Sequence, residues 1–219
     1  MDFDHNKLIA EAAKQVLLPA GLKRVGKSRL YFDDNGWWCG FVEFQPSSWS
    51  KGSYLNVGVS WLLYERNHWA FNISDRVEGF SSAKDENQFK EAVLTKAKQS
   101  KEIVESYREK FSTTLKAYEY YKTLQRPKTI WDNYYKAVIA GMSGEFSDAR
   151  ENFNSLVALP KQYDWEKELN SRALELLQLL NRPKEFIEAV TGIVLRTRTL
   201  LHFENKEPVL LGLPSVEEF

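Results

Sequence analysis

The clearest pattern in the sequence is an alternation of apolar and polar residues that begins at Leu55 and ends at Leu63. Every odd-numbered residue in this stretch is apolar, whereas the first three even-numbered residues are asparagine, glycine and serine. A period of two is typical of a half-buried β-strand, because successive side chains point to opposite faces of a sheet. We therefore predict a strand at 54–64 whose odd-numbered side chains are buried beneath a helix and whose even-numbered side chains face solvent.

Three further strands are predicted around this one. Asn35 and Gly36 separate two aromatic-rich runs and accept the positive φ angles of a tight hairpin turn, so strands near 29–33 and 37–45 should pair. Alternation resumes at 69–74, which predicts a fourth strand. The connections between these strands are short. They predict an antiparallel meander, because a parallel pair needs a crossover of about a dozen residues or more.

Apolar residues at helical spacing predict helices on both sides of these strands. The first helix should span 4–18, because Pro19 disfavours helical backbone in the residue before it. The run 86–124 contains neither proline nor glycine, so it should form one long helix or two nearly collinear helices. The apolar side chains of this run are expected to cover the buried face of the sheet.

The remainder of the chain is predicted to form four shorter helices. Thr129, Ser147 and Asp164 belong to the residue types that cap helix N-termini, and Pro183 is compatible with a first helical turn. The predicted helices are 130–142, 148–159, 165–180 and 183–203. The apolar, proline-containing stretch 207–219 should be an extended tail docked on the body.

Together these patterns predict an α+β fold. A four-stranded antiparallel meander sheet is packed by helices, a long connecting helix follows it, and the C-terminal lobe is all helical. The predicted domains are 1–126, which contains the sheet and the long helix, and 127–219, which contains the helical lobe and the extended C-terminal tail.

The composition indicates which partners and which cellular compartment to expect. Thirty basic and thirty acidic residues cancel, so no net field favours nucleic acid or anionic lipid. Cys39 is the only cysteine, which excludes an internal disulfide and suits a reducing compartment. The N-terminal residues lack the basic start and apolar run of a signal peptide, and no stretch approaches 18 uncharged apolar residues. We therefore expect a cytoplasmic protein without a membrane partner.

The N-terminal part of the chain resembles an uncharacterised bacterial family, the domain of unknown function numbered four thousand three hundred and four. The resemblance covers about residues 3–120 and lies in a helix followed by Gly-Leu-Lys-Arg at 21–24, Phe44-Gln45, Ser47-Ser48 and Tyr-Leu-Asn-Val-Gly-Val at 54–59. Leu22 stands where the family pattern has phenylalanine. The resemblance implies a fold and a bacterial origin, and it implies no activity because none is established for the family.

A second, shorter resemblance lies at 133–159, which is similar to a single tetratricopeptide hairpin. The residues that match the spacing of that repeat are Ala137, Ala140, Gly144, Phe146, Ala149 and Phe153. Lys136 replaces an apolar position of the repeat, and one repeat cannot bury its own apolar face. An ordinary helical hairpin is therefore the favoured interpretation.

The loop after the second predicted strand has the composition of a recognition loop. Polar hydrogen-bonding groups gather there around one large aromatic ring, from Gln45, Ser47, Ser48, Trp49, Ser50 and Asn56. The alternative is that the serines cap a loop and that Trp49 folds back onto the sheet. Both interpretations remain open at this point.

A compact basic run offers a different kind of surface. Lys23, Arg24, Lys27 and Arg29 lie close in sequence to four aromatic residues, Tyr31, Phe32, Trp37 and Trp38. Cations beside exposed rings can bind single-stranded nucleic acid. The favoured alternative is an edge strand that carries charge as protection against unwanted pairing, so a nucleic-acid partner is not expected.

Aromatic residues also gather around the predicted joint between the lobes at Pro127. Trp131 and Tyr134 are the candidates for binding there, beside Tyr118, Tyr120, Tyr121 and Tyr135. The alternative is that these rings form the interface between the lobes. If some of them are exposed, they mark a groove for a partner or ligand.

The sequence contains no motif that predicts catalysis or metal binding. His5, His68 and His202 are scattered without a second ligand at i+3 or i+4, and the glycines form no phosphate-binding loop. We expect no metal, no cofactor and no catalytic residue. The leading hypothesis is a non-catalytic protein-interaction protein of the bacterial cytoplasm, with toxin neutralisation as one specific form. The alternatives are single-stranded nucleic-acid binding through 23–29 and an enzyme whose site assembles from residues distant in sequence.

Overall fold

The computed structural model of the chain describes residues 3–82, 85–124, 129–215 and 217, without the side chains of Asp75 and Glu78. The predicted joint at Pro127 lies outside these residues. Contacts divide the chain into two compact units, each made of two segments. The first unit is Met1–Ser60 with Ala70–Glu109, and the second is Trp61–Trp69 with Lys110–Phe219.

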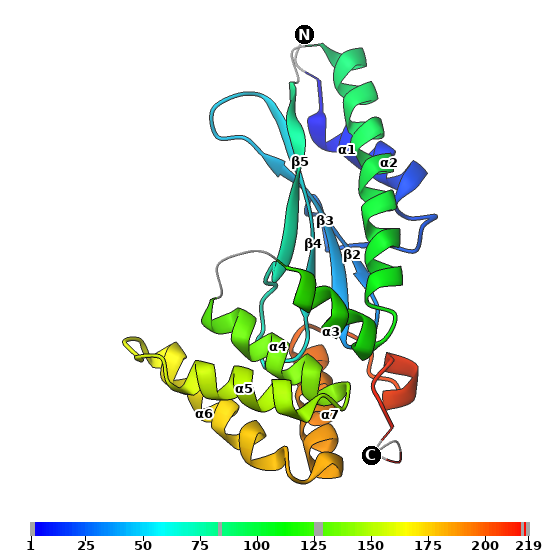
Figure 1. Cartoon of the computed structure of the whole chain (residues 1–219). Helices are drawn as coiled ribbons and strands as arrows, with labels where there is room; N and C mark the ends of the chain where they lie inside the picture. Colours follow the sequence, from blue (N-terminus) through cyan, green and yellow to red (C-terminus); the bar gives the residue numbers. More distant parts are fainter. Residues whose placement is uncertain (1–2, 83–84, 125–128, 216, 218–219) are drawn as a thin grey trace. The chain divides into compact units, whose positions relative to one another are not determined.

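The first unit contains an antiparallel meander sheet, as predicted, and the α+β class is confirmed (Figure 1). Within the described residues the sheet has five strands rather than four, in the order β1-β2-β3-β4-β5. Their bounds are β1 Lys23–Arg24, β2 Leu30–Asp34, β3 Trp38–Pro46, β4 Gly52–Trp61 and β5 Ile73–Ser82. The additional strand β1 pairs with β2 over two residues, a length too short to show any alternation in sequence.

The predicted fourth strand at 69–74 is misplaced, because only Ile73 and Ser74 of this range lie in a strand. Strand β5 begins at Ile73 and pairs with β4 from Val59↔Ile73 to Gly52↔Ser82. The sequence of β5 contains several charged residues, which suit an edge strand that meets solvent along one side. These charged residues hide the apolar alternation by which a strand is recognised in sequence. Most of the alternating residues at 69–74 belong to the connection that precedes β5. In this connection the centroid of the Phe71 ring lies 5.6 Å from the centroid of the Phe41 ring.

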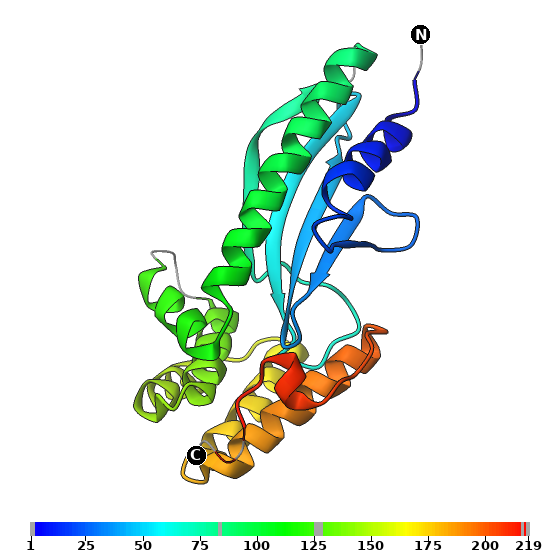
Figure 2. The same ribbon diagram turned by 90° about the vertical axis from the view of Figure 1, so that its right-hand side faces the viewer.

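The buried face of the sheet lies where the sequence predicted it. Leu55, Val57 and Val59 of β4 are fully buried. Helices α1 (His5–Val16) and α2 (Glu86–Lys110) both lie along this face (Figures 1 and 2). Helix α2 contributes buried apolar side chains at helical spacing, including Phe89, Val93, Ala97 and Val104.

The prediction that the even-numbered side chains of β4 face solvent is wrong for two of them. Asn56 is half-buried, but Gly58 and Ser60 are buried. A Cβ atom on Gly58 would lie 2.7 Å from Cδ1 of Phe71 and 2.5 Å from the carbonyl oxygen of Ile73. Phe71 and the start of β5 therefore cover Gly58 on the second face.

An ion pair joins α2 to the sheet. Arg108 donates from Nε to Asp33 Oδ2 over 2.9 Å and from Nη2 to Asp33 Oδ1 over 2.7 Å. The same Nη2 donates to the carbonyl oxygen of Ala20 at 2.7 Å. This bidentate arrangement fixes the relative orientation of the two side chains in addition to their electrostatic attraction. The hydrogen bonds to Asp33 raise the pKa of Arg108.

The second unit is built mainly from helices. Their bounds are α3 Thr114–Thr123, α4 Ile130–Met142, α5 Phe146–Val157, α6 Asp164–Leu179 and α7 Pro183–Leu200. The run 86–124 is therefore two helices, α2 and α3, and the alternative of one long helix is wrong. The chain breaks at 111–113, where the Thr113 hydroxyl accepts a hydrogen bond from the Lys116 N–H and caps α3. The contacts place α3 in the second unit, whereas the sequence analysis placed it in the first domain.

The helix caps and the tail were only partly predictable. Thr129 caps α4 as expected, in a reciprocal arrangement with Asp132. Ser147 and Asp164 lie inside α5 and α6, whose cap positions are Glu145 and Tyr163. The tail is not uniformly extended, because Pro208–Leu211 forms a turn of 3-10 helix. Its anchoring residues, Leu211 and Leu213, are buried.

None of the helices in the described part of the chain combines the length and the apolar character that crossing a membrane requires.

Candidate functional site

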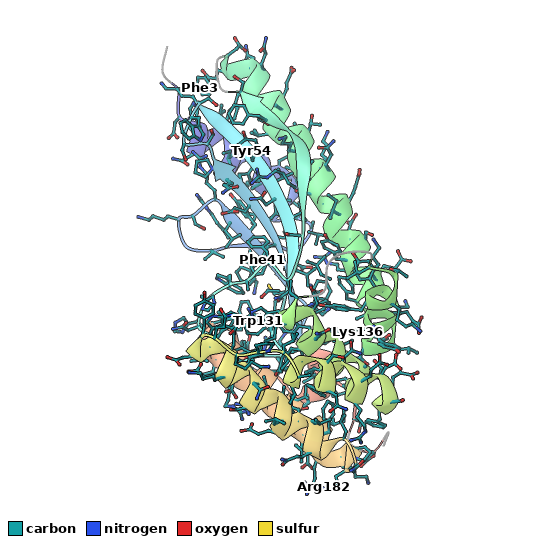
Figure 3. The ribbon with its side chains drawn as sticks, turned by 60° about the vertical axis from the view of Figure 1, so that its left-hand side comes forward. Phe3, Phe41, Tyr54, Trp131, Lys136 and Arg182 are labelled. Atoms are coloured by element: carbon teal, nitrogen blue, oxygen red, sulfur yellow. The ribbon has the colours of Figure 1, made fainter. Side chains whose placement is uncertain are left out.

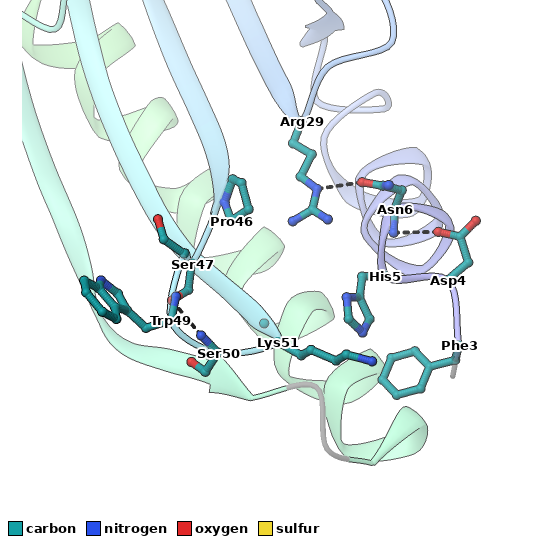
Figure 4. A pocket seen from close by; sticks show the side chains of 12 residues that line it. Phe3, Asp4, His5, Asn6, Arg29, Pro46, Ser47, Trp49, Ser50 and Lys51 are labelled. Carbon is teal, nitrogen blue, oxygen red and sulfur yellow. Dashed lines mark hydrogen bonds between the residues drawn. The ribbon is translucent and has the colours of Figure 1, made fainter. Parts of the chain in front are cut away.

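The first unit has an open hollow of about 620 Å³ beside the loop that joins β3 to β4 (Figure 4). One wall is this loop, 46–52, and the other is the start of α1 together with Arg29. We call this space the loop hollow; its lining residues are Phe3, Asp4, His5, Asn6, Arg29, Pro46, Ser47, Ser48, Trp49, Ser50, Lys51 and Gly52. The sequence analysis offers the loop as one candidate for binding and does not identify the opposite wall.

The Ser47 side chain forms hydrogen bonds to the backbone of the loop. The Ser47 hydroxyl accepts hydrogen bonds from the N–H groups of Trp49 at 3.2 Å and Ser50 at 3.3 Å. Gly52, at φ +151°, brings the chain back into the sheet where a Cβ would lie only 2.2 Å from the carbonyl oxygen of Ser81. The loop is thus fixed both at its tip and at its return to β4.

Trp49 projects from this loop into solvent. Its exposed fraction is 96%, so the interpretation in which the ring folds back onto the sheet is wrong. Figure 4 shows the indole on the side of the loop that faces away from Arg29 and α1. An indole offers a large contact area with few rotatable bonds, so Trp49 is a candidate contact for another molecule.

Arg29 supplies the principal charge of the loop hollow. Its Nε donates to Asn6 Oδ1 over 2.6 Å, and its side chain points into the space between α1 and the loop (Figure 4). Its Nη1 atom is buried and has no hydrogen-bond partner in the structure. Burial lowers the pKa of Arg29, and the nearby Asp4 carboxylate offsets this only in part. The guanidinium is thus a partly dehydrated cation whose hydrogen-bonding capacity is incompletely used.

The other titratable groups of the loop hollow differ in their state of pairing. Asp4 caps α1, and its Oδ1 accepts from the N–H groups of Asn6 at 2.9 Å and Lys7 at 3.1 Å. The His5 ring packs against Phe89, and its Nε2 is buried without a hydrogen-bond partner. Lys51 is exposed and extends toward Phe3 (Figure 4). Among the described lining residues, Arg29 and Lys51 carry permanent positive charges, and Asp4 carries a carboxylate that caps α1.

Gln45 and Asn56, which the sequence placed with the loop, belong to a network on the open part of the sheet. Asn56 Nδ2 donates to Glu43 Oε2 at 2.9 Å and to Gln45 Oε1 at 3.0 Å. Arg76 donates to both amides, to Gln45 at 2.9 Å and to Asn56 at 3.2 Å. These side chains hold β3, β4 and β5 in register, and the hollow is lined without them.

Trp131 and Tyr134, the candidates from the predicted joint, lie on α4 in the second unit. Figure 3 labels Trp131. Tyr134 is fully buried and its hydroxyl donates to the carbonyl oxygen of Leu63 at 3.0 Å, so it is a structural residue. Trp131 is half-buried and stacks on Trp165 with ring centroids 5.9 Å apart. The exposed end of this row is formed by Trp165 and Tyr163, which the sequence analysis did not select.

The structure separates the members of the basic run. Arg24 folds over its own turn, with Nε donating to the carbonyl oxygen of Ser28 at 2.6 Å and Nη2 to that of Lys27 at 3.0 Å. Lys23 and Lys27 are exposed, whereas Arg29 belongs to the loop hollow. Of the four neighbouring rings, Phe32 is half-buried and Tyr31, Trp37 and Trp38 are buried. The last three cannot stack on nucleotide bases, because they form part of the core.

The described residues include no group of three or more histidine, cysteine, aspartate or glutamate side chains placed to hold a metal ion. Cys39 is buried inside β3, where its thiol lies 3.6 Å from the carbonyl oxygen of Gly40. Such a cysteine behaves as a small apolar residue.

The chain matches no protein-family model, and neither the curated proteins nor the solved structures include one with significant similarity to it. Both family resemblances therefore stay predictions.

Proposed function

We propose that this chain is a non-catalytic binding protein that recognises another protein through the loop 46–52, with Trp49 as the central contact. The observation that carries this proposal is the 96% exposure of the Trp49 side chain on a loop with a fixed conformation. Action in the bacterial cytoplasm, and neutralisation of a toxin as one specific form, belong to the same proposal. The single buried cysteine supports a reducing compartment.

Physical chemistry favours tryptophan as such a contact. A tryptophan side chain buries on the order of 150–250 Å² and has few rotatable bonds, so it gains much contact area for a small loss of entropy. The bonds that Ser47 makes to the loop backbone restrict the loop before any partner arrives. A loop that is already ordered loses less conformational freedom on binding than a flexible one.

Single-stranded nucleic-acid binding is less well supported, since three of the four rings expected beside the basic run are in the core. An enzyme whose site assembles from residues distant in sequence stays an alternative.

The proposal is tested by capture from an extract of the native cells on the immobilised full-length protein. We expect one stoichiometric protein to be retained by the wild type, and the affinity of that protein for Trp49→Ala to fall by roughly 30-fold or more, as for a binding hot spot of about 2 kcal/mol. Trp165→Ala is the matched control, because Trp165 is also an exposed tryptophan, at 43%, but lies in the second unit.

Trp165→Ala should bind like the wild type. Trp49→Ala should also keep the thermal stability of the wild type, because its side chain lies in solvent. Equal capture by the wild type and Trp49→Ala, or no stoichiometric partner on the wild type, would contradict the proposal.

A further inference from the structure

One face of the sheet carries a row of side chains that leads from the loop 46–52 to Arg76. Phe80 lies against the end of the loop, because a Cβ on Gly52 would collide with the Phe80 ring. The centroid of this ring lies 5.0 Å from that of Tyr54, and Cζ of Arg76 lies 4.8 Å from the Tyr54 centroid. We call Tyr54, Arg76 and Phe80 the sheet patch.

The sheet patch lies on the face of the sheet that α1 and α2 do not cover. Tyr54 precedes Leu55 on β4, so the two side chains point to opposite faces. Leu55 is buried on the face along which both helices lie (Figures 1 and 2). Tyr54 and Phe80 are half-buried, and Arg76 is exposed. Another molecule can therefore reach the patch.

The sheet patch is close enough to the loop for one partner to cover both. Asn56 of β4 pairs with Arg76, and Gly52 lies four residues earlier on β4, about 14 Å at the rise of a strand. A standard protein interface buries about 800 Å² on each side. We infer that the partner that covers Trp49 also places a carboxylate, from an aspartate or glutamate side chain, against Arg76. This inference rests on the proposed function and adds the chemistry that the partner must present.

Arg76 has a fixed orientation but forms no ion pair in the described part of the chain. Its Nε donates to Asn56 Oδ1 at 3.2 Å and its Nη2 donates to Gln45 Oε1 at 2.9 Å. These bonds use two of the five N–H groups of a guanidinium, and both N–H groups of Nη1 remain for a ligand. The side chain is thus oriented before a partner arrives, which reduces the entropy that binding removes.

The charges near Arg76 favour one carboxylate over a phosphate. Asn56 donates to Glu43 Oε2 at 2.9 Å and accepts from Arg76, so the Glu43 carboxylate lies close to Arg76 without pairing with it. A dianionic phosphate would be repelled by Glu43 more strongly than a carboxylate would. Nucleic acids are bound by several cations along the backbone, whereas the carboxylate of a protein fits the planar fork of one guanidinium.

The test uses the full-length protein and three probes. These are the peptide acetyl-Leu-Glu-Leu-amide, its neutral counterpart acetyl-Leu-Gln-Leu-amide, and an oligothymidylate single strand. The leucines of the peptides can contact the rings of the sheet patch. Binding is followed by NMR through the Nε–H signal of Arg76. We expect the glutamate peptide to shift this signal in a saturable manner and the glutamine peptide to leave it unchanged.

Substitutions locate the binding. Arg76→Gln should weaken binding of the glutamate peptide by about tenfold, the usual effect of losing one charge-assisted hydrogen bond. Arg76→Lys should recover only part of this loss, because an ammonium group keeps the charge but lacks the planar fork. Lys23→Gln is the matched control. It removes an exposed cation on β1, at the other edge of the sheet, and should bind like the wild type.

Glu43→Gln gives a result that misfolding cannot imitate. The glutamine oxygen can still accept from Asn56, but the negative charge near Arg76 is lost. Binding of the glutamate peptide should therefore tighten by about twofold, whereas a destabilised protein would bind less. This variant keeps the test valid even if Arg76→Gln does not fold, and weaker binding in Glu43→Gln would contradict the inference.

Three further results would overturn the inference. These are equal shifts with the two peptides, unchanged affinity in Arg76→Gln, and tighter binding of the oligothymidylate than of the glutamate peptide, which would assign the sheet patch to nucleic acid. The inference and the proposed function fail separately. If the captured partner is lost in Trp49→Ala but fully retained by Arg76→Gln, the inference alone is contradicted. If it is lost in Arg76→Gln but fully retained by Trp49→Ala, the proposed function is contradicted.

Discussion

Replacing Trp61 by alanine should lower the free energy of unfolding of the second unit by about 3–5 kcal/mol, the usual cost of truncating a large aromatic side chain in a core. Trp61 is fully buried, and its ring centroid lies 5.0 Å from that of Phe111. Its Nε1 also donates to the Tyr121 hydroxyl at 2.6 Å. Urea unfolding of the full chain, followed by circular dichroism, measures the change.

Trp61→Phe separates the hydrogen bond from the packing. This variant keeps most of the ring volume and loses the indole N–H, so it should cost much less than Trp61→Ala. Trp165→Ala serves as the comparison at an exposed position and should cost less than about 1 kcal/mol. Equal stabilities for Trp61→Ala and Trp165→Ala would show that Trp61 is not in the core.

The second large effect is expected at Gly58. Gly58→Ala should destabilise the first unit by about 2–3 kcal/mol, because the added Cβ would meet the Ile73 carbonyl oxygen at 2.5 Å and the Phe71 ring at 2.7 Å. The carbonyl belongs to the backbone of β5 and can move only if the two strands separate. The midpoint of urea unfolding reports the effect.

Asn56→Ala is the matched control for Gly58→Ala, because Asn56 lies two residues earlier on the same face of β4. It removes hydrogen bonds of a half-buried side chain and should cost only about 0.5–1.5 kcal/mol. A Gly58→Ala protein as stable as the wild type would mean that the segment containing Phe71 does not cover this face.

The strand that contains Gly58 was only partly predictable from the sequence. The alternation from Leu55 to Val59 was sufficient to place β4 and its buried face, because a single long-range property, burial on one side, decides it. It could not show that Gly58 and Ser60 are also buried. Phe71 lies against Gly58, and the segment that carries Phe71 alternates in the same way as a strand, so local patterning favoured the wrong structure.

The boundary between α2 and α3 could not be predicted from the sequence for a related reason. The run 86–124 has helical spacing throughout, and the break at 111–113 depends on the Thr113 cap and on the burial of Phe111. A threonine inside a helical pattern is a weak signal on its own, since many such residues continue the helix. The cap becomes recognisable only when the packing of Phe111 is known.

The candidate site was predicted in part. The loop 46–52 was selected from its polar residues and Trp49, but the sequence left the orientation of the indole open. The opposite wall could not be foreseen, because Asp4, His5 and Arg29 are distant in sequence from the loop and no local pattern joins them to it. Arg29 was assigned to a basic run, and only the fold separates it from Lys23 and Lys27.

The most direct test of the account is the solvent exposure of the Trp49 indole in solution. The chain has seven tryptophans, and the indole N–H signal of Trp49 can be assigned by NMR from its absence in Trp49→Phe. A soluble gadolinium chelate should broaden this signal more strongly than those of the buried Trp37, Trp38 and Trp61. A Trp49 signal protected to the same extent as these three would show that the ring packs on the sheet, and it would contradict the central role that we assign to this loop.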